Sequence, residues 1–354
     1  VFRSASPESL TILSQIGLLL LMFQIGLEFN FSHLQAVHYR KSVLWVNMAS
    51  LLCPFATGFV VGYYGATQLS PGVNALHSGL FVATAFSITA LPILGRILID
   101  LGMTNHPIGV IAISSAAIND VVGWVLLAVV TALTTAQFSA ASFAFTLVLI
   151  AFFFIASWYV VRPLTHKILN RIEEKTARDF SDLSLGFLLS LIFLAGLCTY
   201  LLGIFAIFGG FMMGVILHDR ERLVQAWRER MGQFVGVFFL PIFFTYTGLR
   251  TNIGGLASLE LWALCLLVIA LACLAKFLPV LLASRMAGHT RVEAKQLGIL
   301  MNTRALMELI VINIGFDLKV ISQNLFTMLV LMAIVSTVVT TPMMRRWMKS
   351  PSAA

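Results

Sequence analysis

The stretch Ile108–Leu133, IGVIAISSAAINDVVGWVLLAVVTAL, is apolar and long enough to cross a bilayer as one helix, which takes about 20 residues. It contains Asp120, the only formally charged residue between Asp100 and Arg162. A carboxylate near the membrane midplane costs about 2.5–3.5 kcal/mol on insertion scales, so it faces a bundle interior or a water-filled path. The alternative is a buried polar group that only holds helices together. We interpret Asp120 as a candidate ion or proton site, beside the neutral amide of Asn119, which can ligate a cation but cannot titrate.

The rest of the chain has the composition of a polytopic membrane protein. Of its 354 residues, 59% are hydrophobic and 11% are charged, whereas globular domains have about 25% charged residues. The net charge of +8 does not indicate nucleic-acid binding, because the basic residues fall mainly in every second loop, with Arg250 and Lys319 as exceptions. This alternation predicts that the odd-numbered segments and the C-terminus end in the cytoplasm.

Apolar windows predict about eleven membrane segments. They run near Leu10–Phe29, Ser42–Tyr64, Leu76–Ile99, Ile108–Leu133, Ala140–Val161, Leu183–Leu202, Ile204–Leu217, Gly232–Leu249, Leu261–Met286, Ala294–Ile314 and Leu325–Met344. The sequence has no Gly-rich strand–turn–helix signature. We therefore expect a single transmembrane domain over residues 1–354, without a soluble regulatory domain.

Two of these segments are polar and interrupted. In the third segment, TAFSITALP at 84–92 places Ser87, Thr89 and Pro92 at the expected midplane. In the tenth, MNTRALME at 301–308 contains Asn302, Thr303, Arg304 and Glu308. Two broken helices of opposite direction in corresponding positions are typical of inverted-repeat transporters. The alternative is a proline kink together with an unrelated polar helix.

Further charges lie within the membrane segments. Lys276 is the only charged residue between Glu260 and Arg285, and it lies too deep for easy snorkelling, so Asp120 is its expected partner. Arg304 and Glu308 have i, i+4 spacing and share a helix face, which favours a structural ion pair over direct ion contact.

Several stretches together resemble the cation/proton antiporter-2 family, with plant-type cation/proton exchangers and their bacterial relatives as the most similar subgroup. The stretches are SITALPILGRIL at 87–98, SSAAINDVVGW at 114–124, LGILMNTRALMELIVINIG at 297–315, LPIFFTYTGL at 240–249 and FQIGLE at 23–28. The resemblance implies an all-α polytopic protein with the sodium/proton-antiporter fold, inverted repeats and two crossed discontinuous helices. It also implies that about eleven of thirteen helices are present, that core-domain segments lie near 76–133 and 261–344, and that the protein is a homodimer.

The same resemblance implies roles for individual residues. Asp120 would bind the monovalent cation or the proton, with Asn119 and Thr89 beside it and Lys276 as the core-domain lysine. Ser87, Pro92, Asn302, Thr303, Arg304 and Glu308 would form or support the helix breaks. Family members often have Gly at the position of Ala305, so alanine there is expected to stiffen the second break.

The resulting prediction is a secondary antiporter that exchanges K⁺ or Na⁺ for H⁺ by alternating access, with electroneutral stoichiometry. It is expected in the lipid bilayer of a bacterial inner membrane, without a cofactor and without enzymatic chemistry, since no Ser/His pair or metal-ligand cluster lies in the core segments. The main alternative is a channel-like K⁺ efflux system on the same fold, but a filter signature is not visible. A sensor without ion flux would not need Asp120 together with Lys276.

Overall fold

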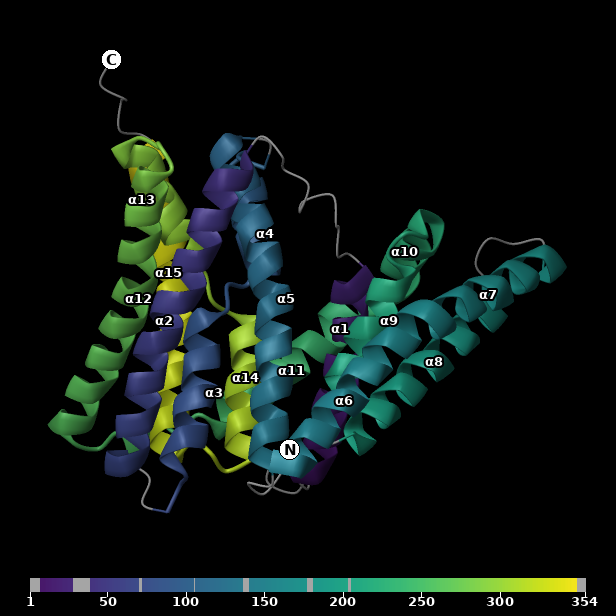
Figure 1. Ribbon diagram of the computed structural model, residues 1–354, viewed down its shortest axis with the longest axis horizontal. Helices are drawn as coiled ribbons and strands as arrows, with labels where there is room; N and C mark the ends of the chain where they lie inside the picture. The colour runs from purple at the N-terminus through teal and green to yellow at the C-terminus, as the bar shows by residue number, and fades with distance from the viewer. Residues whose placement is uncertain are drawn as a thin grey trace. The chain divides into compact units, whose positions relative to one another are not determined.

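The computed structural model describes residues 7–27, 39–69, 72–104, 106–135, 140–176, 181–202 and 205–348, which are helical with short connections (Figure 1). The chain folds into two compact units. Unit 1 consists of Val1–Asn30 and Thr131–Arg250, and unit 2 consists of Phe31–Val130 and Thr251–Ala354. Each unit is therefore assembled from segments that lie far apart in the sequence.

Unit 1 is built around the packing of α1 on α9. Its elements are α1 (Pro7–Leu27), α6 (Ala140–Ala156), the π-helix η3 (Ser157–Val161), α7 (Arg162–Thr176), α8 (Asp182–Leu201), α9 (Ala206–Leu217), α10 (Glu221–Trp227), the π-helices η4 (Arg228–Gly232) and η5 (Val235–Phe239), and α11 (Leu240–Arg250). Glycines bring α1 and α9 close together: a Cβ at Gly26 would collide with the carbonyl of Phe211, and one at Gly214 with the carbonyl of Phe23. Small residues at such a contact allow close backbone packing in membranes.

Unit 2 contains both interrupted segments. Its elements are α2 (Arg40–Leu69), α3 (Ala75–Ser87), α4 (Leu91–Asp100), α5 (Pro107–Thr135, which belongs to this unit up to Val130), the 3₁₀ turn η6 (Ile253–Gly255), α12 (Leu259–Met286), α13 (Arg291–Met301), α14 (Leu306–Asp317) and α15 (Gln323–Met348). Helix α2 packs on α3 and α12, and α14 packs on α3 (Figure 1).

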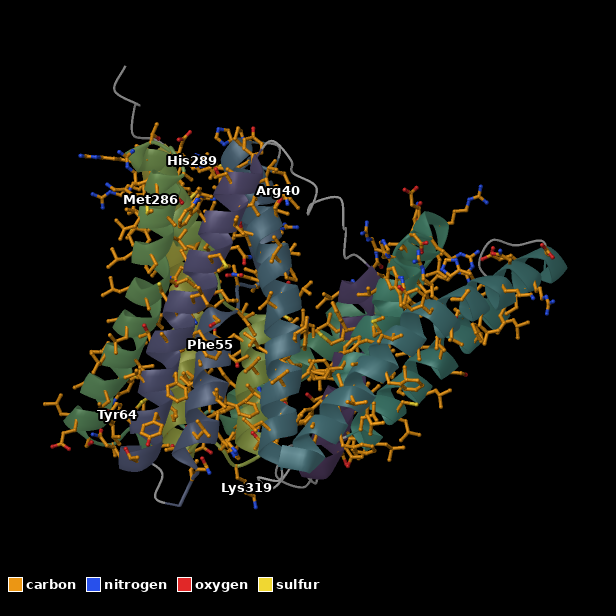
Figure 2. All side chains as sticks on the ribbon, in the orientation of Figure 1. Arg40, Phe55, Tyr64, Met286, His289 and Lys319 are labelled. Atoms are coloured by element: carbon orange, nitrogen blue, oxygen red, sulfur yellow. The ribbon has the colours of Figure 1, made fainter. Side chains whose placement is uncertain are left out.

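Local signals define where these helices begin. The side chain of Asn74 accepts from the backbone N–H groups of Leu76 and His77 at the start of α3. Thr290 and Glu293 form a reciprocal capping box at the start of α13. Between α12 and α13, His289 lies 2.8 Å from the hydroxyl of Ser42, so this turn is held against the first turn of α2. Figure 2 shows His289 at the same end of unit 2 as Arg40, with Tyr64 toward the other end of α2.

The third predicted segment is broken as expected, but the break lies upstream of the proline. Helix α3 ends at Ser87, Ile88–Ala90 are non-helical, and α4 starts at Leu91. Pro92 therefore lies in the first turn of α4, where its missing N–H group has no helical partner to lose. The tenth segment breaks between Met301 and Leu306, with a bend of 41° between α13 and α14.

The eleven predicted segments all correspond to helices in the described part of the chain. Eight are long apolar spans, of which the third has its break at Ile88–Ala90, two are bent helix pairs, and the seventh is the short apolar α9. Two helical stretches extend beyond the predicted membrane segments: the fifth continues from Val161 to Thr176, and the eighth begins at Glu221, ahead of Gly232. The chain stays helical through Pro163 because the π-helix η3, which ends two residues earlier, has a wider turn than an α-helix. Residues 162–176 then form an amphipathic helix.

Candidate functional site

The two helix breaks of unit 2 cross and are hydrogen-bonded to each other. The hydroxyl of Thr89 donates to the carbonyl of Met301 over 3.1 Å. The backbone N–H of Ala90 donates to the carbonyl of Thr303 over 3.0 Å. Non-helical backbone within a membrane must find such partners, because lipid offers none. The two breaks are thus held together by hydrogen bonds to backbone groups that have no partner within their own helix.

Asp120 faces this crossing from α5. One turn further along α5, a Cβ at Gly123 would lie 2.7 Å from Cγ1 of Ile88, so glycine lets α5 approach the first break closely. The Asp120 residue is 2% exposed, and its carboxylate lies near the backbone of Leu91. Leu91 is the first residue of α4, and a helix N-terminus favours a negative charge. The buried carboxylate oxygen Oδ1 has no hydrogen-bond partner within the described residues.

Asn119 lies at the centre of a buried amide and hydroxyl network. Its Nδ2 donates to the hydroxyls of Ser50 (2.9 Å) and Thr89 (3.1 Å). Its Oδ1 accepts from Nδ2 of Asn47 at 3.0 Å, and the same nitrogen donates to the carbonyl of Ser115 at 3.0 Å. Asn119 therefore connects α2, α5 and the first helix break.

Lys276 binds backbone rather than a carboxylate in this conformation. Its ammonium donates to the carbonyls of Ser87 (2.7 Å) and Ile88 (2.8 Å), where α3 ends. Cations are stabilised at helix C-termini, where the last carbonyls have no helical donors. The expected ion pair between Lys276 and Asp120 is not formed within 4.0 Å here, because the freed carbonyls take the ammonium hydrogens.

Arg304 holds the second break against α3 and α12. Its guanidinium donates to Glu308 (3.2 Å), to the carbonyl of Ala85 (3.4 Å) and to the carbonyl of Ala272 (3.1 Å). Arg304 is fully buried and Glu308 is 1% exposed. The backbone of Arg304 also exchanges hydrogen bonds with the hydroxyl of Thr337 on α15. These contacts brace the break from three further helices, α3, α12 and α15.

The remaining predicted site residues lie at the breaks with different partners. The hydroxyl of Ser87 has its single hydrogen within reach of the carbonyls of Ala83 (2.8 Å) and Leu51 (3.2 Å), so it turns toward α3 and α2 and away from the break. The hydroxyl of Thr303 donates to Leu300 within the last turn of α13. Asn302 is 2% exposed, and its Oδ1 has no partner in the described structure.

Ala305 lies in the second helix break and adopts the backbone conformation needed there although it is not glycine. Its φ of −173° is extended backbone that alanine tolerates. The stiffening expected at this position therefore does not come from a forbidden φ.

Asn47 and Ser50 are site residues that the sequence pattern did not identify. They lie on α2 with i, i+3 spacing, so both side chains share one face of the helix. They are 6% and 0% exposed. A polar pair on one face of an otherwise apolar segment was the available signal, but only the fold shows that this face meets Asn119.

A carboxylate with an open oxygen, buried where two discontinuous membrane helices cross, defines an inverted-repeat transporter of ions. A family model described as "Sodium/hydrogen exchanger, transmembrane" matches residues 1–349. The chain therefore belongs to the sodium/hydrogen exchanger family, as the sequence resemblance implied.

Curated relatives and a solved structure agree with this family. The chain is 36% identical over 353 residues to the Na⁺/H⁺ antiporter NhaS4 of Synechocystis sp., covering 99% of this chain and 85% of that protein. It is 34% identical over 342 residues to Cation/H⁺ antiporter 18 of Arabidopsis thaliana, covering 97% of this chain and 42% of that much longer protein. The sodium proton antiporter MjNhaP1 of Methanocaldococcus jannaschii has a similar structure, with a TM-score of 0.67 and 18% identity over 98% of this chain and 86% of that one. The predicted antiporter fold is confirmed.

Proposed function

We propose that this protein exchanges a monovalent cation, K⁺ or Na⁺, for a proton, and that Asp120 binds each of them in turn. The observation that carries the proposal is the buried Asp120 carboxylate, whose Oδ1 has no partner among the described residues at the crossing of the two breaks. An ionised carboxylate there needs a cation or a proton, because lipid and apolar side chains cannot solvate it. Alternating access would expose the site to each side of the membrane in turn.

Oxygen atoms around the crossing are suited to a hard cation. Besides Asp120, the hydroxyl of Thr89 retains one lone pair after accepting from Asn119. The Oδ1 atom of Asn302 is also unpartnered within the described structure. Carboxylate, hydroxyl and amide oxygens are the ligands that unpolarisable cations prefer. We propose that the cation binds at Asp120 with Thr89 beside it, while Asn119 holds Thr89.

The buried charges support one-for-one, electroneutral exchange. In the described part of unit 2 the fully buried formal charges are Asp120 and Glu308, both negative, and Lys276 and Arg304, both positive. Glu308 and Arg304 neutralise each other, and the Lys276 ammonium is held by two carbonyls. Asn119 cannot titrate. Replacing a bound cation at Asp120 by a proton therefore leaves the charge of this group of residues unchanged.

Vesicle exchange with each cation in turn tests the function. Purified protein in proteoliposomes with an internal pH dye should release or take up protons when K⁺ or Na⁺ is added outside. A channel-like efflux system would instead pass the cation along its gradient without moving protons in return, which would overturn the antiport proposal. The same series shows which of the two cations is transported.

The membrane location and the oligomeric state of the protein are proposed on separate grounds. We propose that the protein lies in a bacterial inner membrane with its C-terminus in the cytoplasm, which the alternation of Lys and Arg between loops supports. We also propose that it works as a homodimer, as the family resemblance implies. Cysteine labelling of a residue introduced near the C-terminus tests the orientation, and light scattering of the detergent-solubilised protein tests the dimer.

A further inference from the structure

One backbone carbonyl fixes the direction of every hydrogen bond around Asn119. The carbonyl of Ser115 can only accept, so the atom of Asn47 that lies 3.0 Å from it must be the NH₂ nitrogen. The same nitrogen lies 3.0 Å from the side chain of Asn119, so the facing atom of Asn119 must be its oxygen. The orientation of the Asn119 amide is therefore set from α2.

The orientation of Asn119 in turn orders two hydroxyl groups. Its NH₂ donates to Ser50 and to Thr89, so each hydroxyl accepts there and has its own hydrogen left to donate. Ser50 donates to the carbonyl of Asn47 (3.0 Å), and Thr89 donates to the carbonyl of Met301 (3.1 Å). The chain of hydrogen bonds that starts on α2 thus ends on the second helix break.

A flipped Asn119 amide would undo this order. Its oxygen would then face Thr89, and the Thr89 hydroxyl would turn its hydrogen toward that oxygen. The carbonyl of Met301 would lose its donor, and one of the two hydrogen bonds between the crossed breaks would be lost. The NH₂ group of Asn47 prevents the flip, because it would face another NH₂ group.

We infer that Asn47 and Ser50 are positioning residues for ion exchange: acting through Asn119, they fix the direction of the Thr89 hydroxyl and so hold the crossed breaks beside Asp120. This inference rests on the proposed function. Neither residue is assigned contact with the ion. As a result, the Thr89 hydroxyl offers one free lone pair to a cation, and its hydrogen points away from the cation, toward the carbonyl of Met301.

A purely structural role would have a different signature. Buried amide networks also stabilise helix packing, and their loss lowers the amount of folded protein and the maximal rate. A positioning role changes the oxygen ligands that the cation meets, so it changes the apparent KM and the ratio of KM values between cations. The two roles are separable in one set of variants.

The test measures cation-dependent proton exchange in proteoliposomes for Asn47→Ala, Ser50→Ala, Asn119→Ala and the double variant Asn47→Ala/Asn119→Ala. Thr57→Val is the matched control for Ser50→Ala, because the Thr57 hydroxyl also donates to a carbonyl of α2 but is exposed. We expect the apparent KM to rise about three- to tenfold in both Asn47→Ala and Ser50→Ala, the range given by loss of one buried hydrogen bond. Thr57→Val should leave the KM unchanged.

The double variant decides whether Asn47 acts through Asn119. We expect its KM to equal that of Asn119→Ala, because the Asn47 amide then has nothing to orient. Independent, multiplying effects would overturn the inference, and so would a wild-type KM in Asn47→Ala. If Asn47→Ala does not fold, Ser50→Ala still tests the inference, because a KM equal to that of Thr57→Val would overturn it. Absence of exchange in the wild type would instead reject the proposed function itself.

Discussion

The ammonium of Lys276 lies 2.7 Å from the carbonyl of Ser87, at the C-terminal end of α3, and forms no ion pair with Asp120. Lys276 therefore caps the C-terminal end of α3. It satisfies two carbonyls that the helix break exposes, those of Ser87 and Ile88, and places a positive charge where the helix dipole favours one. Asp120 is thereby left free for an ion in this conformation.

Lys276→Ala should lower the stability of the folded protein strongly. The substitution leaves two buried carbonyls without donors, and each such group costs about 1–3 kcal/mol. The melting temperature of the detergent-solubilised protein should fall by several degrees. Lys295→Ala is the control, because Lys295 is exposed on α13. Equal melting temperatures for the two variants would contradict the capping role.

Arg304 and Glu308 should behave as a coupled structural pair. Removing one partner of a buried ion pair costs about 3–5 kcal/mol, because the other charge is left buried and alone, whereas replacing both with apolar residues costs far less. Arg304→Met and Glu308→Met should each melt well below the wild type, and the double variant should recover part of the loss. A double variant that melts as far down as the sum of the single variants would show that the pair is not coupled.

Much of this arrangement was predictable from the sequence. Asp120 was identified because a lone carboxylate in an apolar helix requires a function, and the two breaks were identified because polar residues interrupt apolar runs. The partner of Lys276 was not predictable, since it is backbone that only becomes available when α3 ends at Ser87. Asn47 was missed because a single amide in an apolar helix is common, and its meaning depends on a neighbour 72 residues away.

A surface ion pair in unit 1 gives a pH-dependent prediction. Burial alone would raise the pKa of Asp219, but the hydrogen bond and charge of Arg162, with a contribution from His166, hold that pKa below its ordinary value of 3.8. A carboxyl group with a lowered pKa stabilises the fold above its ordinary pKa, and this stabilisation is lost as the pH falls through the lowered value.

Asp219→Asn should therefore melt slightly below the wild type at neutral pH, and the difference should disappear under strongly acidic conditions. The effect should be small, because partly exposed pairs contribute about 0–1 kcal/mol. Asp182→Asn is the control, since its side chain is fully exposed and its contact with Arg230 is 3.5 Å long. A difference that grows on acidification would contradict the assignment.

Exchange should be insensitive to membrane potential. With one carboxylate carrying either one monovalent cation or one proton, no net charge crosses the membrane in a cycle. If Na⁺ is transported, its exchange in proteoliposomes should keep the same initial rate when valinomycin and a K⁺ gradient impose a potential of either sign. A rate or end-point set by the potential would show that a second group, with Lys276 as the first candidate, also releases a proton.

The most direct test of the central claim is cation-driven proton movement by Asp120→Asn in proteoliposomes, measured beside wild type and Asp100→Asn. Asp100 offers the same change of charge at an exposed site, where its carboxylate pairs with Arg96 over 3.1 Å. We predict that Asp120→Asn is folded and inserted but moves no protons in response to K⁺ or Na⁺, while Asp100→Asn exchanges like the wild type. Exchange at the wild-type rate by folded Asp120→Asn would contradict the claim that Asp120 carries the ion.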